Sequence, residues 1–291
     1  MIVGLRLEGL GEGAELAEQA GFDFVFLDNS TAPDAPIGAD ALSVAAFLMT
    51  RTRRLGLVAS VPDSWQPFNV ARALASFDHL SRGRCGWLPW PGPGEAPNAA
   101  RSAEHLDVVL QLFDSWDDDA LVFDKAASVF ADRDKVRRIQ HCGAYFTVDG
   151  PLNAPRPPQG RPVLFRRGAG GSPEADVELV ALEDWKPLPS GAGDAPLRLA
   201  EVVVDPGGGR AADLAEQLAD AFQLGLDGVL LEPADPAADI ALLAGELIPQ
   251  LVARGGFALS TAGGDFRSRL GLARPVNRFS GQAGMAGPPR S

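Results

Sequence analysis

Apolar residues along the chain follow two patterns, one typical of buried strands and one typical of amphipathic helices. Short apolar runs such as residues 22–27 have the length and bulk of strands that are buried on both faces. Longer stretches such as residues 67–80 repeat apolar positions every three or four residues, and Pro67 stands first, where its missing N–H costs no hydrogen bond. The two patterns alternate along most of the chain, which is typical of an α/β protein.

Eight strands are predicted, over residues 3–7, 22–27, 54–60, 84–89, 162–166, 176–182, 197–204 and 227–231. Six helices are predicted, over residues 14–20, 39–50, 67–80, 99–113, 211–224 and 237–254. The segments after the fifth and sixth strands are rich in Gly and Pro and have no helical repeat, so we expect these two crossovers to lack helices. This order predicts a (β/α)8 TIM barrel over residues 1–280. Residues 281–291 are expected to form a flexible tail.

Composition excludes several classes of partner. The net charge of −12 and the pI near 4.7 argue against binding to nucleic acid or to an anionic membrane, because phosphate groups would repel the protein. The two cysteines, Cys85 and Cys142, provide neither a disulfide framework nor the spacing of metal ligands, so no metal site is expected. No leader pattern and no run of membrane-spanning length is found in the sequence, so we expect a cytoplasmic protein.

The most particular sequence lies between the fourth predicted helix and the fifth predicted strand. It reads LFDSWDDDAL at 112–121, HCGAYF at 141–146 and GPLNAPRPPQGRP at 150–162. Further short motifs are AGFDFVFLD at 20–28, TRRLGL at 52–57, NVAR at 69–72, SFDHLSRGR at 76–84 and LGLARP at 270–275. In this order they resemble the luciferase-like, flavin-dependent monooxygenases. The branch they resemble most contains nitrilotriacetate and dibenzothiophene-sulfone monooxygenases.

This resemblance implies an enzyme that takes reduced FMN from a separate flavin reductase and uses O2 to oxygenate a small organic substrate. The flavin would lie across the mouth of the barrel, at the carboxyl ends of the strands. The positions that match its binding site are Asp28, Ser60, Arg166, Gly168, Gly170 and Ser172. Trp65, Trp87 and Trp90 lie near the predicted mouth and are expected to line the substrate pocket. No catalytic residue can be assigned.

Several positions depart from the family pattern at this site. Leu88 stands where the family has Asn, and Ala99 stands where it has Tyr. The phosphate-binding turn has Ala169 and Gly170 in place of two serines. Each lost charge-assisted hydrogen bond weakens binding by roughly 1.5–3 kcal/mol. A second function is therefore open: a non-catalytic barrel that no longer binds flavin and supports an active paralogue or binds a small molecule. The assembly is expected to be a homodimer or a heterodimer with such a paralogue.

Structural roles remain open for the same residues. Asp28 is equally suited to stabilising a turn after its strand, and the tryptophans are equally suited to filling an empty mouth.

The glycines at residues 9–13 follow a strand like a dinucleotide-binding loop, but their spacing does not fit and Glu12 would repel a pyrophosphate. Residues 206–210 precede a helix at a place where barrels often bind phosphate.

Overall fold

The computed structural model describes residues 1–28, 40–92, 98–168, 174–187, 195–204, 210–234, 236–254 and 263–280. Eight parallel strands close into a barrel, and each strand pairs with the next along the chain. They are β1 (Ile2–Leu7), β2 (Phe24–Leu27), β3 (Gly56–Pro62), β4 (Cys85–Trp90), β9 (Val163–Arg167), β10 (Val177–Ala181), β11 (Leu197–Val204) and β12 (Gly228–Pro233). The predicted α/β barrel is confirmed, and each predicted strand overlaps one of these eight. The predicted tail at residues 281–291 lies outside the described residues.

Alternating side chains on each strand divide the core into two layers. One cluster fills the barrel and includes Phe24, Phe26, Val58 and Phe165. Their sequence neighbours, such as Val25, lie in the larger cluster between the strands and the surrounding helices. The continuous apolar runs in the sequence follow from this arrangement, because both faces of a barrel strand are covered.

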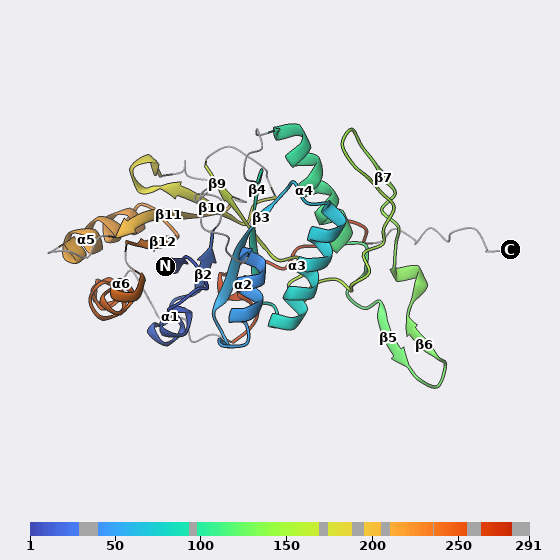
Figure 1. Cartoon of the computed structure of the whole chain (residues 1–291), viewed down its shortest axis with the longest axis horizontal. Coiled ribbons are helices and arrows are strands. Elements are labelled where there is room, and N and C mark those ends of the chain that lie inside the picture. Colours follow the sequence, from blue (N-terminus) through green and yellow to red (C-terminus); the bar gives the residue numbers. More distant parts are fainter. Residues whose placement is uncertain are drawn as a thin grey trace.

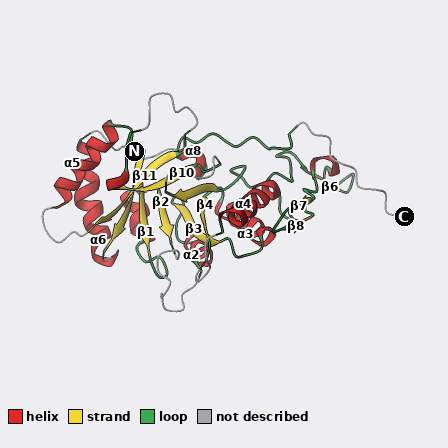
Figure 2. Cartoon of the chain, turned by 90° about the horizontal axis from the view of Figure 1, so that it is seen from above, coloured by secondary structure: helices red, strands yellow, loops and turns green. Residues whose placement is uncertain are grey.

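Helices surround most of the barrel (Figure 2). They are α1 (Ala14–Ala20), α2 (Ala41–Leu48), α3 (Pro67–Ser81), α4 (Ala99–Phe113), α5 (Arg210–Gln223), α6 (Pro236–Leu242) and α7 (Ile248–Ala253). The last predicted helix is divided, because Leu243–Leu247 forms a π-helical stretch between α6 and α7. Pro249 explains the division, since it has no N–H to donate to the carbonyl one turn earlier. In the described parts of the crossovers after β9 and β10 the only helical turn is the 3₁₀ turn η2 (Leu182–Asp184).

An arm leaves the barrel between α4 and β9 and carries two antiparallel hairpins that the sequence analysis did not predict (Figure 1). The first hairpin consists of β5 (Leu121–Asp124) and β6 (Val129–Ala131), followed by the 3₁₀ turn η1 (Arg133–Lys135). The second consists of β7 (His141–Cys142) and β8 (Thr147–Val148). A buried ion pair of 2.9 Å between Arg156 and Asp114 anchors the base of the arm.

A short helix near the C-terminus, α8 (Phe266–Arg269), fills the end of the barrel where the strands begin. The Phe266 ring is fully buried and its centre lies 5.9 Å from that of Phe24 and 6.4 Å from that of Phe165. A side chain at Gly56, the first residue of β3, would collide with this ring. Because α8 fills this end of the barrel, we look for a site at the opposite end, where the strands end.

Candidate functional site at the barrel mouth

Five charged side chains lie inside the barrel at the carboxyl ends of its strands. Arg6 comes from β1, Asp28 directly follows β2, Arg167 ends β9, Glu201 lies on β11 and Glu232 on β12. We refer to these five residues as the mouth network. Each shares the inward side of its strand with residues of the inner cluster, because side chains two residues apart on a strand point the same way.

Asp28 is the most buried member of the network. Its side chain is 0% exposed, and its Oδ2 atom lies 2.6 Å from Arg167 Nη2 and 3.3 Å from Arg6 Nη2. A buried carboxylate needs such partners to remain charged. Asp28 was predicted to follow the second strand and to bind flavin; the structure places it after that strand, between two guanidinium groups.

The two arginines are themselves held by the remaining carboxylates. Arg167 donates from Nε and Nη2 to Glu201 Oε1, at 3.0 and 2.8 Å. Arg6 donates from Nη1 to Glu232 Oε2 at 2.7 Å. The network thus combines three carboxylates with two guanidinium groups, so its own balance is negative. A dianionic phosphate brought against it would meet net repulsion.

Arg167 is fixed as a cation by these neighbours. Burial would lower its pKa, but the hydrogen bonds to Glu201 and the charge of Asp28 outweigh this effect and raise the pKa above its ordinary value. Its guanidinium carbon also lies 5.7 Å from the ring centre of Phe26, within the range of a cation–π contact. The Arg167 side chain is therefore held by the Phe26 ring and by the carboxylates of Asp28 and Glu201.

Strand β4 presents mainly apolar groups to the mouth. Leu88 is buried in the inner cluster, and Trp90 packs against that cluster. The indole Nε1 of Trp90 is buried and has no hydrogen-bond partner in the described part of the chain. Ser60 lies opposite Leu88 in the register of β3 and β4 and is also buried. At the mouth, β4 therefore offers the indole N–H of Trp90 as a buried donor beside the leucine.

Two of the predicted site residues point away from the mouth. Trp87 is fully buried in the outer cluster, between β4 and the helices, so the prediction that it lines the pocket is corrected. Arg166 also lies on the outer side of its strand, where its Nη2 atom is 2.7 Å from Glu178 Oε1. The physical reason is the same for both: neighbouring residues of a strand point to opposite faces, and Leu88 and Arg167 hold the inward positions.

The remaining predicted residues border the mouth or lie outside the described residues. Trp65 is partly exposed after β3, and its carbonyl oxygen lies 3.0 Å from His105 Nε2 on α4. Burial lowers the pKa of His105, so the neutral ring can donate this hydrogen bond. Gly168 follows β9 with a φ of 78°, a left-handed conformation that suits glycine at the start of a turn. Gly170 and Ser172 lie outside the described residues.

Arg6, Glu201 and Glu232 were missed by the sequence analysis. Each is a charged residue inside a mainly apolar strand, such as Arg6 between Leu5 and Leu7. Charged residues at inward positions of several strands were the signal that could have found them. The described residues, those at the mouth included, contain no cluster of three or more side chains suited to a metal ion. Nor does any described helix have the length and apolarity needed to cross a membrane.

Comparisons with known proteins agree with the barrel fold. The family described as luciferase-like monooxygenase matches residues 4–182, more than half of the chain. The chain is 38% identical to one of the pristinamycin IIA synthase subunits of Streptomyces pristinaespiralis, over 91% of this chain and 88% of that protein. It is 36% identical to a dibenzothiophene-sulfone monooxygenase from Rhodococcus erythropolis, over 53% of this chain but only 41% of the longer relative.

Solved structures show the same fold at lower identity. An EDTA monooxygenase from Chelativorans sp. BNC1 superposes with a TM-score of 0.73 at 20% identity, over 94% of this chain and 99% of that one. A riboflavin lyase superposes with a TM-score of 0.74 at 23% identity, over 96% and 97% of the two chains. The parallel barrel defines the class of protein. Within that class, the chain belongs to the luciferase-like monooxygenase family, whose members use reduced flavin.

Proposed function

We propose that this chain is the companion subunit of a flavin-dependent monooxygenase whose flavin is held by a paralogous barrel. The complete enzyme would use reduced FMN, delivered by a separate reductase, and O2 to oxygenate a small organic substrate. It would act in the cytoplasm, on a small molecule and not on nucleic acid or a membrane. The oxygen chemistry belongs to the flavin, and this chain contributes a barrel to the assembly.

The observation that carries this proposal is the mouth network. Its five side chains pair with one another, so part of their hydrogen-bonding capacity is already used at the place where the flavin is expected. The negative balance of the network would also disfavour the anionic reduced flavin and its phosphate. Leu88 adds an apolar side chain where a hydrogen-bonding group is expected. These features support the proposal that a paralogous barrel, and not this one, holds the FMN.

The relatives support an enzyme built from two related barrels. The relative matched over most of both chains is named as one of the subunits of pristinamycin IIA synthase. Another subunit of the same synthase also matches this chain, at 34% identity over 33% of this chain. Two related proteins are thus named as parts of one enzyme, and we extend that arrangement to this chain.

Co-purification with a full-length luciferase-like paralogue tests the proposal. We expect a mixed complex that contains flavin, whereas this chain purified alone contains none. Oxygenation of substrate should then require both barrels and reduced FMN. A flavin-loaded assembly of this chain alone that oxygenates substrate would rule the proposal out.

A second candidate function, an enzyme that holds FMN itself, is favoured by one specific observation. The buried N–H of Trp90 has no partner in the described structure and could donate to an isoalloxazine edge. Under this alternative, Trp90→Phe would weaken FMN binding severalfold, because it removes the donor and keeps an aromatic ring. Under the leading proposal neither the natural protein nor this variant binds FMN, so a flavin titration of both separates the two functions.

A further inference from the structure

The turn of the β7–β8 hairpin is held by one carboxylate of α4, the helix beside which the hairpin rises (Figure 1). Glu104 accepts hydrogen bonds from the backbone N–H groups of Ala144, Tyr145 and Phe146, at distances between 2.8 and 3.2 Å. Its Oε1 atom also lies 3.1 Å from Nε2 of His141, the first residue of β7. Desolvation opposes the charge of Glu104, but the hydrogen bonds from His141 and from the backbone outweigh it and lower the pKa of the carboxyl group. Glu104 therefore stays ionised and fixes the hairpin on the helix.

Phe146, at the end of this turn, packs against two other side chains of α4. Its ring is buried, and the ring centre lies 5.7 Å from that of His105 in an edge-to-face contact. The guanidinium carbon of Arg101 lies 5.2 Å from the centre of the same ring, within the range of a cation–π contact. Glycine at residue 143 lets the turn come this close, because a side chain at Gly143 would collide with Glu104. Phe146 therefore covers both His105 and Arg101.

Arg101 and His105 in turn hold the loop that follows β3 at the barrel mouth. Arg101 Nη1 donates hydrogen bonds to the carbonyl oxygen and to Oδ1 of Asp63, at 3.1 and 3.2 Å. Nε2 of His105 donates to the carbonyl oxygen of Trp65, at 3.0 Å. The Trp65 side chain itself is 39% exposed. Because a loop that follows a barrel strand lies on the catalytic side of the barrel, these contacts connect the hairpin on the arm with the mouth.

The two linking side chains depend on the hairpin for their conformation. Arg101 is long and flexible, and its contact with the Phe146 ring restricts the rotamers that it can adopt. The same ring shields His105 from water, and burial lowers the pKa of His105, which keeps its ring neutral at pH 7. Its Nδ1 atom is buried and has no hydrogen-bond partner among the residues that the structure describes, so a proton added there would be unpaired. Removing the Phe146 ring would hydrate both groups and loosen their hydrogen bonds to Asp63 and Trp65.

We propose that the β7–β8 hairpin sets the position of Trp65 at the barrel mouth, with Glu104 and Phe146 as positioning residues. An aromatic wall of the mouth is thus fixed from the arm, although the arm contributes no side chain to the mouth network. Glu104 would thereby influence which small molecules fit beside Trp65 without touching them. The inference concerns this wall alone, so it holds whichever barrel of the proposed enzyme carries the flavin.

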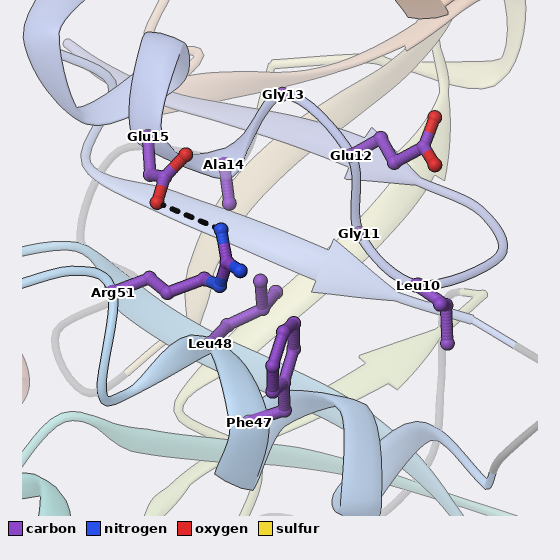
Figure 3. Close-up of a pocket in the computed structure, with 9 residues that line it drawn as sticks. All are labelled: Leu10, Gly11, Glu12, Gly13, Ala14, Glu15, Phe47, Leu48 and Arg51. Atoms are coloured by element: carbon purple, nitrogen blue, oxygen red, sulfur yellow. Dashed lines mark hydrogen bonds and ion pairs between the residues drawn. The ribbon is translucent and has the colours of Figure 1, made fainter.

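Acrylamide quenching of Trp65 fluorescence, taken as the difference between each protein and its Trp65→Phe counterpart, tests the proposal. In Glu104→Ala the quenching constant of Trp65 should rise about twofold, because the local contacts of its loop loosen. Phe146→Ala should have the same effect, and the double variant should add nothing, because both changes break one series of contacts. Glu15→Ala is the matched control and should leave Trp65 unchanged. Glu15 pairs with Arg51 at 3.2 Å (Figure 3), and its helix α1 lies on another side of the barrel from α4 (Figure 1).

Proton NMR supplies a second readout, because His105 is one of only three histidines. In Glu104→Ala water should reach the His105 ring, so its pKa should rise toward the ordinary value of 6.5. Hydrogen exchange at residues 144–146 should quicken in the same variant and report release of the hairpin. Glu104→Gln, which keeps the shape of the side chain but not its charge, should move all three readouts in the same direction. A released hairpin that leaves Trp65 quenching or the His105 pKa unchanged overturns the proposal. So does a hairpin that keeps its protection without Glu104, or an equal response to Glu15→Ala.

Discussion

Arg166 and Arg167 are neighbours in the sequence but lie on opposite sides of β9. Arg167 enters the mouth and joins Asp28 and Glu201, whereas Arg166 lies outside the barrel beside Glu178. The two side chains have the same chemistry but pair with different carboxylates. They therefore provide a matched pair for measuring what the mouth network contributes.

Arg167→Met should destabilise the protein by about 2–3 kcal/mol, because it removes the nearer of two arginines beside the buried Asp28 and a hydrogen-bond donor to Glu201. Arg166→Met removes one ion pair, but Glu178 keeps Arg198 at 3.4 Å, so the loss should be about 1 kcal/mol or less. Urea unfolding of both variants measures the difference. Equal losses in the two would show that the network does not hold the mouth.

Asp78 at the end of α3 makes stability depend on pH. Its carboxylate accepts hydrogen bonds from Gln159 and from the Cys85 backbone, yet burial outweighs them and raises its pKa from 3.8 to about 6. Between these values the folded protein holds a proton that the unfolded chain releases, so folding is favoured as the pH falls. The natural protein should gain roughly 2–3 kcal/mol relative to Asp78→Asn as the pH falls from 7 to 4.

Unfolding free energies of the natural protein and Asp78→Asn, measured at several pH values, check this prediction. The subtraction removes the effects of other titrating groups, such as His105, whose pKa is lowered by burial. A difference that stays constant over this range would contradict the account of Asp78.

At the scale of single elements, α8 closes the barrel with one aromatic ring. Phe266→Ala should cost about 3–5 kcal/mol, because it leaves a cavity between Phe24 and Phe165 that the barrel cannot collapse to fill. Phe266→Leu fills most of that space and should cost clearly less. Thermal or urea unfolding measures both. If the alanine variant is as stable as the leucine variant, α8 does not close the core.

The elements of the barrel could be predicted from the sequence, and those of the arm could not. Runs such as Phe24–Leu27 are apolar on both faces, so the sequence records their burial directly. The hairpins contain strands of two to four residues with exposed side chains, such as β7, and no periodicity distinguishes them from loops.

At the mouth, the ends of the strands could be predicted from the sequence, but which residues point into the barrel could not. A shift of one residue puts Leu88 instead of Trp87, and Arg167 instead of Arg166, on the inward side of its strand.

At the scale of the whole molecule, the barrel mouth and the arm are separate parts of the protein. The mouth, with its negative balance, lies at the carboxyl ends of the strands, whereas the arm leaves the barrel between α4 and β9 (Figure 1).

The central claim is that the mouth network occupies the place of a flavin in this barrel. A fluorescence titration of FMN with the purified chain, repeated with reduced FMN by its absorbance, tests this claim most directly. We predict no saturable change for the natural protein. Saturable quenching with a micromolar dissociation constant, abolished by Trp90→Phe, would contradict the claim and make this chain the flavin-binding barrel itself.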